Sequence, residues 1–184
     1  MICPWALKDE FLKAYHDEEW CRPHHEDTYL FEMLILEGAQ AGLSWSTILK
    51  RRYRKTFFHF DISRCAGMTD EEMEEIGRTA PIIRNRRKIN SVRQNARAVL
   101  AIQKEWGSFS RYLWHFTENK IIVHHLQDND ALPASSPLSE KISADLKKRG
   151  CTFAGPVIIY SFLQAAGIID DHLESCPFRS TNRF

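Results

Sequence analysis

The chain lacks the features that would assign its class at once: it has no long apolar run, no surplus of one charge and no repeat. Its most apolar stretch, Phe153–Ile169, is shorter than a bilayer span and is interrupted by Pro156 and Gln164. We therefore expect a buried core helix there and no membrane association. The formal net charge is only +1, so the overall charge gives no argument for binding to nucleic acid.

Cysteine is also scarce, with five residues in 184, and the opening MICPWALKDE has no basic stretch followed by an apolar run. Without a secretory signal, these cysteines favour a reducing compartment over a disulfide framework, so we expect a cytoplasmic protein. The hydrophobic and charged contents, 43% and 27%, are ordinary for a globular protein. A chain of this length is expected to form one structural unit, 1–184.

Apolar periodicity and capping residues predict helices almost throughout, and hence an all-α fold. Candidate helix starts are Asp27, Ser44, Thr69 with Glu72, and Ser136 with Pro137. The expected helices are Leu30–Glu37, Trp45–Phe58, Thr69–Ile76, Lys88–Glu105, Phe109–Phe116, Pro137–Gly150 and Pro156–Ala166, with a strand or extended connection at Ile121–Val123.

Positive charge is concentrated in three runs, at 50–55, 84–97 and 147–149, and the second follows a short connection between two of these helices. Gly77 is expected to end the first helix and Pro81 lies in the turn. The residues just after the turn are basic: Arg84, Arg86, Arg87 and Lys88. The arrangement is typical of a helix-hairpin-helix element, whose turn N–H groups and following helix N-terminus bind a DNA phosphate. The alternative is that each basic run is only a solvated helix face.

The stretch Leu30–Trp45, LFEMLILEGAQAGLSW, combines an apolar helix face with an unusual ending. Glu37 directly follows the apolar run and precedes small residues that include Gly38 and Gly42. A carboxylate is seldom buried unless it is paired or used, and the glycines let a backbone or a ligand approach closely. The alternative is a solvated Glu37 near a helix end, with Trp45 as a core aromatic.

Cysteine and histidine gather at the two ends of the chain in a pattern that suits a metal. His172 and Cys176 have three residues between them, and Cys3 with His16 completes a Cys2His2 set. Four protein ligands leave no position for a catalytic water, so such a zinc site is structural. The spacing is not that of a common zinc finger, and the rival ligands Cys21, His24 and His25 remain open at this point.

Three long motifs in order resemble the DNA-3-methyladenine glycosylase I family, relatives of the helix-hairpin-helix DNA glycosylases. They are AYHDEEW at 14–20, LFEMLILEGAQAGLSW at 30–45, and KKRGCTFAGPVIIYSFLQAAGIIDDH at 147–172. Cys3, His16, His172 and Cys176 fall where that family holds its structural zinc. The resemblance implies a zinc-bound annex formed by 1–26 and 165–184, and a helical body over 27–164 with the hairpin near 76–88.

The resemblance also implies a reaction and its residues. The family hydrolyses the bond between deoxyribose and 3-methyladenine in double-stranded DNA, which releases the free base and leaves an abasic site, without a lyase step. The enzyme is expected to be a monomer. The implied roles are Glu37 as the carboxylate that reads the base, Tyr15 and Trp45 as stacking walls, Trp5 and Trp20 near the pocket, Ser161 at its floor, Gln40 and Leu43 in the loop that plugs the duplex, and the hairpin basic residues on the backbone.

The chemistry of the lesion agrees with these implied roles. Alkylation at N3 makes the base cationic, which favours aromatic faces and a carboxylate and removes the need for a strong general acid. Pro81 departs from the family, which commonly has glycine there, and it has no N–H to donate to a phosphate. A catalytically inactive DNA-binding module and a purely structural zinc-linked protein are therefore kept as alternatives.

Overall fold

The structure is a computed structural model that describes residues 1–40, 42–82, 84–127 and 132–182. Its helices are α1 (Glu10–Glu18), α2 (Asp27–Ala39), α3 (Trp45–Arg51), α4 (Ile62–Ala66), α5 (Asp70–Thr79), α6 (Arg86–Trp106), α7 (Phe109–His115), α8 (Pro137–Lys148) and α9 (Pro156–Ala165). Short 3₁₀ segments are η1 (Pro4–Lys8), η2 (Phe58–Phe60) and η3 (Ser180–Asn182), and two short strands are β1 (Ile122–Val123) and β2 (Ile169–Asp170). The predicted helical class is confirmed. Within the described residues, no helix combines the length and apolar character needed to cross a membrane.

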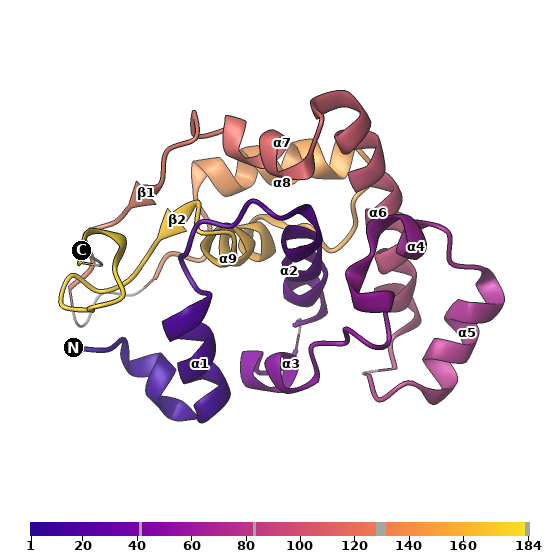
Figure 1. The fold of residues 1–184 in the computed structure, drawn as a ribbon, viewed down its shortest axis with the longest axis horizontal. Helices are drawn as coiled ribbons and strands as arrows, with labels where there is room; N and C mark the ends of the chain where they lie inside the picture. The colour runs from indigo at the N-terminus through magenta and orange to yellow at the C-terminus, as the bar shows by residue number, and fades with distance from the viewer. Residues whose placement is uncertain (41, 83, 128–131, 183–184) are drawn as a thin grey trace.

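Helix α2 lies at the centre of the fold and contacts α6, α7 and α9 (Figure 1). Every residue from Leu30 to Gly38 is buried, including the two carboxylates Glu32 and Glu37. The sequence predicted one buried, apolar face for this helix, whereas the structure buries the helix on all sides. A helix that is hydrophobic all round belongs in a core. Its carboxyl end, which carries Glu37, consequently lies deep in the molecule.

At Gly38 the segment that leads into α9 packs directly against α2. A Cβ atom at this position would lie 3.1 Å from Cβ and 3.2 Å from the carbonyl oxygen of Phe153. Because Gly38 has no Cβ atom, the backbone of Phe153 can pack directly against α2. Gly42 differs: its φ is +84° and open space surrounds it, so the turn between α2 and α3 requires its backbone freedom.

Asp27 was wrongly predicted to cap α2. It is the first residue of that helix, whose N-cap is Glu26. Its carboxylate instead accepts hydrogen bonds from the backbone N–H groups of Phe109 and Ser110, each at 2.8 Å, at the start of α7. A side chain from a distant segment thus supplies acceptors for the orphan donors of another helix.

Helix α3 was wrongly predicted to extend to Phe58, since it ends at Arg51. Arg52 has a left-handed backbone with φ +41° and donates from Nε to buried Glu32 at 3.0 Å. Arg54 donates to the same carboxylate at 2.9 Å and 3.0 Å. An unpaired buried carboxylate costs several kcal/mol, so its two arginine partners outweigh continuation of the helix.

The remaining helix boundaries divide into confirmed starts and one misplaced end. Ser44 and Ser136 cap α3 and α8 as predicted, and Thr69 with Glu72 forms a complete capping box. Helix α5, however, continues past Gly77 to Thr79, where it was predicted to stop at Ile76. The glycine is tolerated inside a helix at a cost of about 1 kcal/mol.

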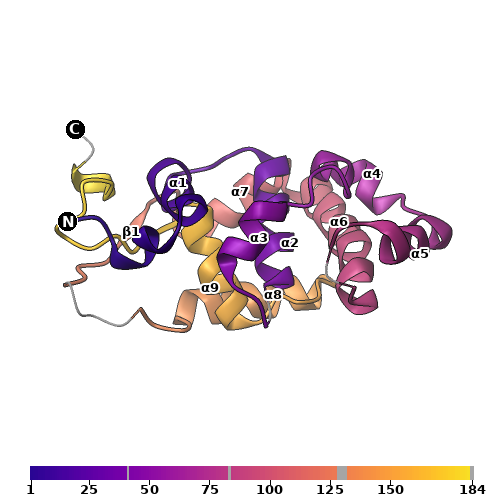
Figure 2. The same ribbon diagram turned by 90° about the horizontal axis from the view of Figure 1, so that it is seen from below.

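The two ends of the chain meet on one side of the molecule, as both views show (Figures 1 and 2). Strand β1, at the expected position, pairs in parallel with β2, with Ile122 opposite Ile169 and Val123 opposite Asp170. A further bridge joins Leu126 and Leu173. This pairing anchors the carboxyl-terminal segment next to η1 and α1, where the predicted metal ligands lie.

Candidate active site: a buried carboxyl group in an aromatic pocket

A cavity of about 250 Å³ opens between the amino-terminal segment, the end of α2 and helix α9. It is lined by Trp5, Tyr15, Trp20, Glu37, Gln40, Trp45, Leu132, Ser161 and Gln164. All of the residues predicted to bind or read the base are therefore brought to one cavity, by five helical elements and the turn after α1. Helix α2 delivers Glu37, and α9 delivers Ser161.

Glu37 is the only carboxyl group among the described residues that line this cavity. Its residue is 5% exposed, and it forms no side-chain hydrogen bond to any described residue. Burial raises the pKa of its carboxyl group to about 8. The group is thus held near the point where it gains or loses a proton at neutral pH, which is typical of functional carboxyl groups.

Aromatic rings in two edge-to-face pairs form the walls beside Glu37. The rings of Tyr15 and Trp45 have centroids 5.4 Å apart at an angle of 67°, and those of Trp5 and Trp20 are 4.8 Å apart at 82°. Edge-to-face packing holds each ring in one orientation. The cavity therefore presents fixed electron-rich surfaces next to a group that can become negative, an arrangement suited to a flat cationic ligand.

A second, larger hollow of about 530 Å³ adjoins the first and shares Glu37, Gln40 and Ser161 with it. Leu43 lies at its edge and is half-buried. The N–H of Leu43 donates to the carbonyl of Gln40 at 2.7 Å, which closes a tight turn before α3. The two residues predicted to plug a duplex are therefore neighbours at the mouth of the pocket.

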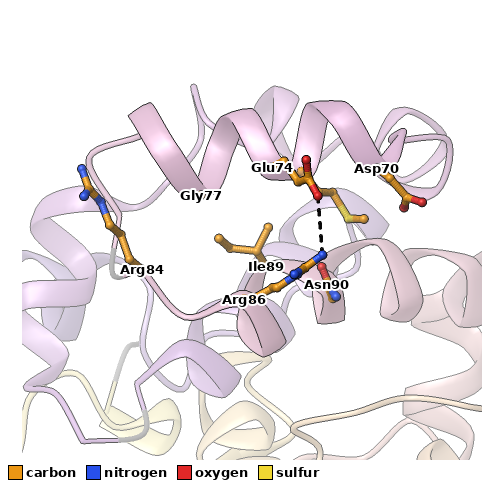
Figure 3. A pocket seen from close by; sticks show the side chains of 8 residues that line it. Asp70, Glu74, Gly77, Arg84, Arg86, Ile89 and Asn90 are labelled. Atoms are coloured by element: carbon orange, nitrogen blue, oxygen red, sulfur yellow. Dashed lines mark ion pairs between the residues drawn. The ribbon is translucent and has the colours of Figure 1, made fainter.

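The predicted hairpin consists of α5, α6 and their connection, and a hollow of about 480 Å³ lies between the two helices. Figure 3 shows Arg86 aimed across this hollow at Glu74, with a closest separation of 3.5 Å, and Arg84 pointing away from it. Both arginines are exposed. Arg84 is therefore positioned to face a ligand, whereas Arg86 forms an ion pair with Glu74.

The start of α6 differs from the arrangement expected of a phosphate-binding helix. The side chain of Asn85 accepts hydrogen bonds from the backbone N–H groups of Arg87 and Lys88, at 3.0 Å and 3.3 Å. The Nζ of Lys88 donates to the carbonyl oxygen of Ala39 at 2.8 Å, so this lysine is half-buried against the end of α2. In the connection, Arg51 donates to the carbonyl of Pro81 at 3.0 Å.

Three of the predicted metal ligands form a buried cluster in which each pair of donor atoms lies within 4.8 Å: Cys3, His16 and Cys176. A hydrogen bond from the Cys3 thiol and a contact with His16 lower the pKa of Cys176 well below that of an ordinary thiol. A thiolate beside an imidazole is the donor type that zinc prefers. The cluster thus has the chemistry of a metal site.

The fourth predicted ligand, His172, is adjacent to this cluster, with its ring centroid 4.9 Å from that of His16. It is fully buried, and its Nε2 has no hydrogen-bond partner in the part of the chain that the structure describes. Its Nδ1 lies 2.7 Å from Oδ1 of Asp170, and the Nδ1 of His16 lies 2.7 Å from Oδ1 of Asp17. Carboxylates that hold one ring nitrogen and leave the other for a metal are characteristic of histidine ligands.

The rival ligands are placed differently. The Nε2 of His24 lies 3.2 Å from the carbonyl of Glu19, and the Nδ1 of His25 lies 3.1 Å from Oγ of Ser110. Neither histidine belongs to a metal-suited cluster of the described residues. Cys21 lies close to Asp170 and His172 in a neighbouring group, so it is the one rival with a position near the predicted ligands.

The cysteine–histidine cluster is in direct contact with the walls of the pocket. The ring centroids of Trp5 and His16 are 5.4 Å apart, and those of Trp20 and His172 are 4.7 Å apart. Aromatic contacts at this separation transmit position from one ring to the next through close packing. Holding the two histidines in place therefore also orients Trp5 and Trp20.

Two lining residues, Leu132 and Gln164, were missed from the sequence. Gln164 follows Ser161 by three residues on α9, a spacing that places both on one helix face, so its position could have been inferred from that of Ser161. Leu132 comes from the connection before α8 and carries no comparable signal. It is 42% exposed and reaches the cavity only through the fold of that connection.

The sequence and the fold match known proteins over nearly the whole chain. The family model for methyladenine glycosylase covers residues 5–180. The DNA-3-methyladenine glycosylase of Haemophilus influenzae is 39% identical over 181 residues, 97% of this chain and 98% of the relative. DNA-3-methyladenine glycosylase 1 of Escherichia coli is 42% identical over 176 residues, 95% and 94% of the two chains.

A solved structure supports the same assignment. The crystal structure of a variant of 3-methyladenine DNA glycosylase I in complex with 3-methyladenine superposes with a TM-score of 0.93 at 34% identity, covering 96% of each chain. Sequence identity of 34–42% over nearly the whole length of both chains shows common descent. The chain therefore belongs to the methyladenine glycosylase family and is a glycosylase, a hydrolase that acts on N-glycosyl bonds.

Proposed function

We propose that the protein excises 3-methyladenine from alkylated double-stranded DNA, as a monomer and without a lyase step. The observation that carries this proposal is the buried Glu37 carboxyl group facing a cavity walled by aromatic rings. Relatives named as DNA-3-methyladenine glycosylases, and a related structure with the base bound, support this choice of substrate.

Glu37 provides discrimination between a cationic base and a neutral one. Burial raises the pKa of its carboxyl group to about 8, so ionisation in the empty pocket is costly. A bound cation repays this cost by Coulomb attraction, whereas neutral adenine does not. The faces of Tyr15 and Trp45 add about 1–2 kcal/mol per well-placed ring for the charged base. The ionised carboxylate also accepts a hydrogen bond from the exocyclic amine.

The reaction follows from the charge of the lesion. When the bond between N9 and C1′ breaks, its electron pair neutralises the alkylated base, which leaves without needing a proton. Water adds to C1′, loses a proton to solvent and completes the abasic sugar. No lysine lines the pocket among the described residues, so a Schiff-base step has no nucleophile there, and the enzyme is monofunctional.

The duplex is held by elements around the mouth of the pocket. Leu43 and Gln40 fill the space that the flipped base leaves, which offsets part of the few kcal/mol that unstacking costs. Arg84 and Arg87 are exposed beyond the hairpin and contact phosphates as charged side chains. Because Asn85 already accepts from the N–H groups of Arg87 and Lys88, side chains contribute more to this grip than the N-terminus of α6.

A structural zinc ion is part of the proposal, with Cys3, His16, His172 and Cys176 as its ligands. The unpartnered buried Nε2 of His172 and the low pKa of Cys176 support this set. The ion would join the terminal segments, 1–26 and 165–184, into one annex. Through the contacts of His16 with Trp5 and of His172 with Trp20, that annex keeps the pocket walls in place.

The direct test is release of free 3-methyladenine from methylated DNA by wild type, Glu37→Gln and Glu140→Gln. Glu140 is exposed on α8 and is the matched control. We expect release by wild type and by the control, and a loss of at least about tenfold in Glu37→Gln, from one charge-assisted interaction of about 1.5–3 kcal/mol. Salt-dependent DNA binding without any base release would instead favour the catalytically inactive DNA-binding module.

A further inference from the structure

The side-chain amide of Gln164 is held in one orientation by a buried carboxylate that has no role so far. Its Nε2 donates to Oδ2 of Asp171 at 2.6 Å. The hydroxyl of Tyr160 donates to the same oxygen at 2.6 Å. A carboxylate only accepts hydrogen bonds, so the amide nitrogen of Gln164 must face Asp171, and the opposite assignment of its oxygen and nitrogen would be repulsive.

Asp171 is itself fixed from its other side. Its side chain is fully buried, and Oδ1 lies 2.6 Å from Nδ1 of His124. Its backbone lies next to β2, which pairs with β1. Partners on both oxygens leave Asp171 no room to rotate. The network therefore determines which atom of Gln164 remains for the pocket.

That atom is the carbonyl oxygen. Gln164 lines the pocket together with Glu37 and Ser161, and its Oε1 accepts no hydrogen bond from any described residue. We propose that Gln164 is a specificity residue that accepts a hydrogen bond from the exocyclic amine of the flipped base, and that Asp171 is the positioning residue that enforces its acceptor role. This inference rests on the proposed function, because it concerns the base that the pocket holds.

The chemical consequence is discrimination at position 6 of the purine. An exocyclic amine has two N–H donors, which the structure can satisfy with one oxygen of Glu37 and the oxygen of Gln164. A 6-oxo purine places a carbonyl there, and two facing acceptors repel each other. A site built to pair a buried polar group rejects a ligand that leaves the group unpaired. The pocket should thus select amino purines over oxo purines as well as cations over neutral bases.

The first variant is Gln164→Met, which keeps the length of the side chain and removes both polar atoms. The matched control is Gln103→Met, because Gln103 also donates its Nε2 to a carboxylate, that of Asp27, at 2.6 Å, and it lies outside the pocket. The measurement is release of 3-methyladenine and of 3-methylguanine from one preparation of methylated DNA, with thermal unfolding as the check on folding.

We expect Gln164→Met to lower the ratio of 3-methyladenine to 3-methylguanine release about fivefold, the effect of one lost neutral hydrogen bond. The ratio should stay at the wild-type value in Gln103→Met. A purely structural role would lower both activities together. An unchanged ratio in a folded Gln164→Met variant therefore overturns the proposal.

The second variant, Asp171→Asn, tests the positioning role and serves if Gln164→Met does not fold. An asparagine can face Gln164 with either its oxygen or its nitrogen, so the glutamine amide becomes able to turn its donor toward the pocket. We expect the ratio to fall because 3-methylguanine release is retained better than 3-methyladenine release. A parallel decrease of the two would contradict the positioning role.

Binding of the two free bases, followed by the fluorescence of the pocket tryptophans, separates this inference from the proposed function. If wild type releases neither base, the proposed reaction fails, and the inference is then judged on binding alone. Tighter binding of 3-methyladenine than of 3-methylguanine that weakens about fivefold in Gln164→Met supports it. Equal weakening for both bases overturns it.

Discussion

The Nζ of Lys88, at the start of α6, lies 2.8 Å from the carbonyl oxygen of Ala39, the last residue of α2. This bond joins the helix that follows the hairpin to the helix that carries Glu37. A cation at a helix carboxyl end is favourable because the last carbonyls of the helix carry partial negative charge. Lys88 therefore connects the two parts of the proposed site that must act on the same nucleotide.

Lys88→Met should lower the free energy of unfolding by at least about 0.5–1 kcal/mol, since it removes the hydrogen bond to the carbonyl of Ala39 and a helix-end charge. The control is Arg87→Met, which removes an equal charge from an exposed position next in sequence and should leave stability within about 0.5 kcal/mol. Urea unfolding measures both. If the two variants are equally stable, the bond to Ala39 contributes nothing to stability.

Glu37 should give the reaction a pH dependence on the alkaline side of neutrality. Burial raises the pKa of its carboxyl group to about 8, so the group is mostly neutral below that pH and gains its charge as the pH rises through it. Because the charged form attracts the cationic base, kcat/KM for lesion-containing DNA should rise about tenfold between pH 7 and pH 9. The rise should be absent in Glu37→Gln and present in Glu140→Gln.

The same raised pKa also predicts the sign of an effect on stability. The folded protein keeps the Glu37 proton between the unfolded pKa of about 4.5 and the folded pKa of about 8. Stability contributed by Glu37 therefore falls as the pH rises through this window and levels off above it. Glu37→Gln should gain stability relative to wild type on going from pH 5 to pH 9, as measured by urea unfolding. A difference that is constant with pH would mean that Glu37 ionises freely.

Trp45→Leu should weaken binding of 3-methyladenine by about tenfold, because one aromatic face over a cation contributes about 1–2 kcal/mol. The matched control is Trp106→Leu, since Trp106 stacks on His115 at the end of α6, with ring centroids 4.2 Å apart, and does not line the pocket. Free-base titration provides the comparison. Equal binding by the two variants would show that Trp45 is only a core aromatic.

Metal content tests the zinc ligands separately from activity. Wild type should contain about one zinc per chain, and Cys176→Ser should lose the metal and several kcal/mol of stability together. Cys65→Ser is the control, because Cys65 is buried elsewhere and its thiol donates to the carbonyl of Phe57 at 3.3 Å, a bond that a serine hydroxyl can replace. Full metal retention in Cys176→Ser would transfer the role to a rival ligand, of which Cys21 is the nearest.

The sequence by itself determined the helical class and the caps at Ser44, Thr69 and Ser136, and its resemblance to a known family already identified all the pocket-lining residues except Leu132 and Gln164. Caps and helix periodicity depend on hydrogen bonds and packing within a few residues, so they can be read locally. The assignment of Glu37 and Trp45 to one site came from resemblance along three motifs, because the stretch that contains them is also compatible with an ordinary core helix.

Only the tertiary structure decided which side chains from distant segments form hydrogen bonds with one another. Asp27 serves the start of α7, Arg52 leaves the helix to reach Glu32, and neither partner is near in sequence. The raised pKa of Glu37 arises because α2 is enclosed on every side. The orientation of Gln164 depends on Asp171, the residue after β2. Burial and hydrogen bonding are properties of the assembled surroundings, which a residue's neighbours in the chain do not specify.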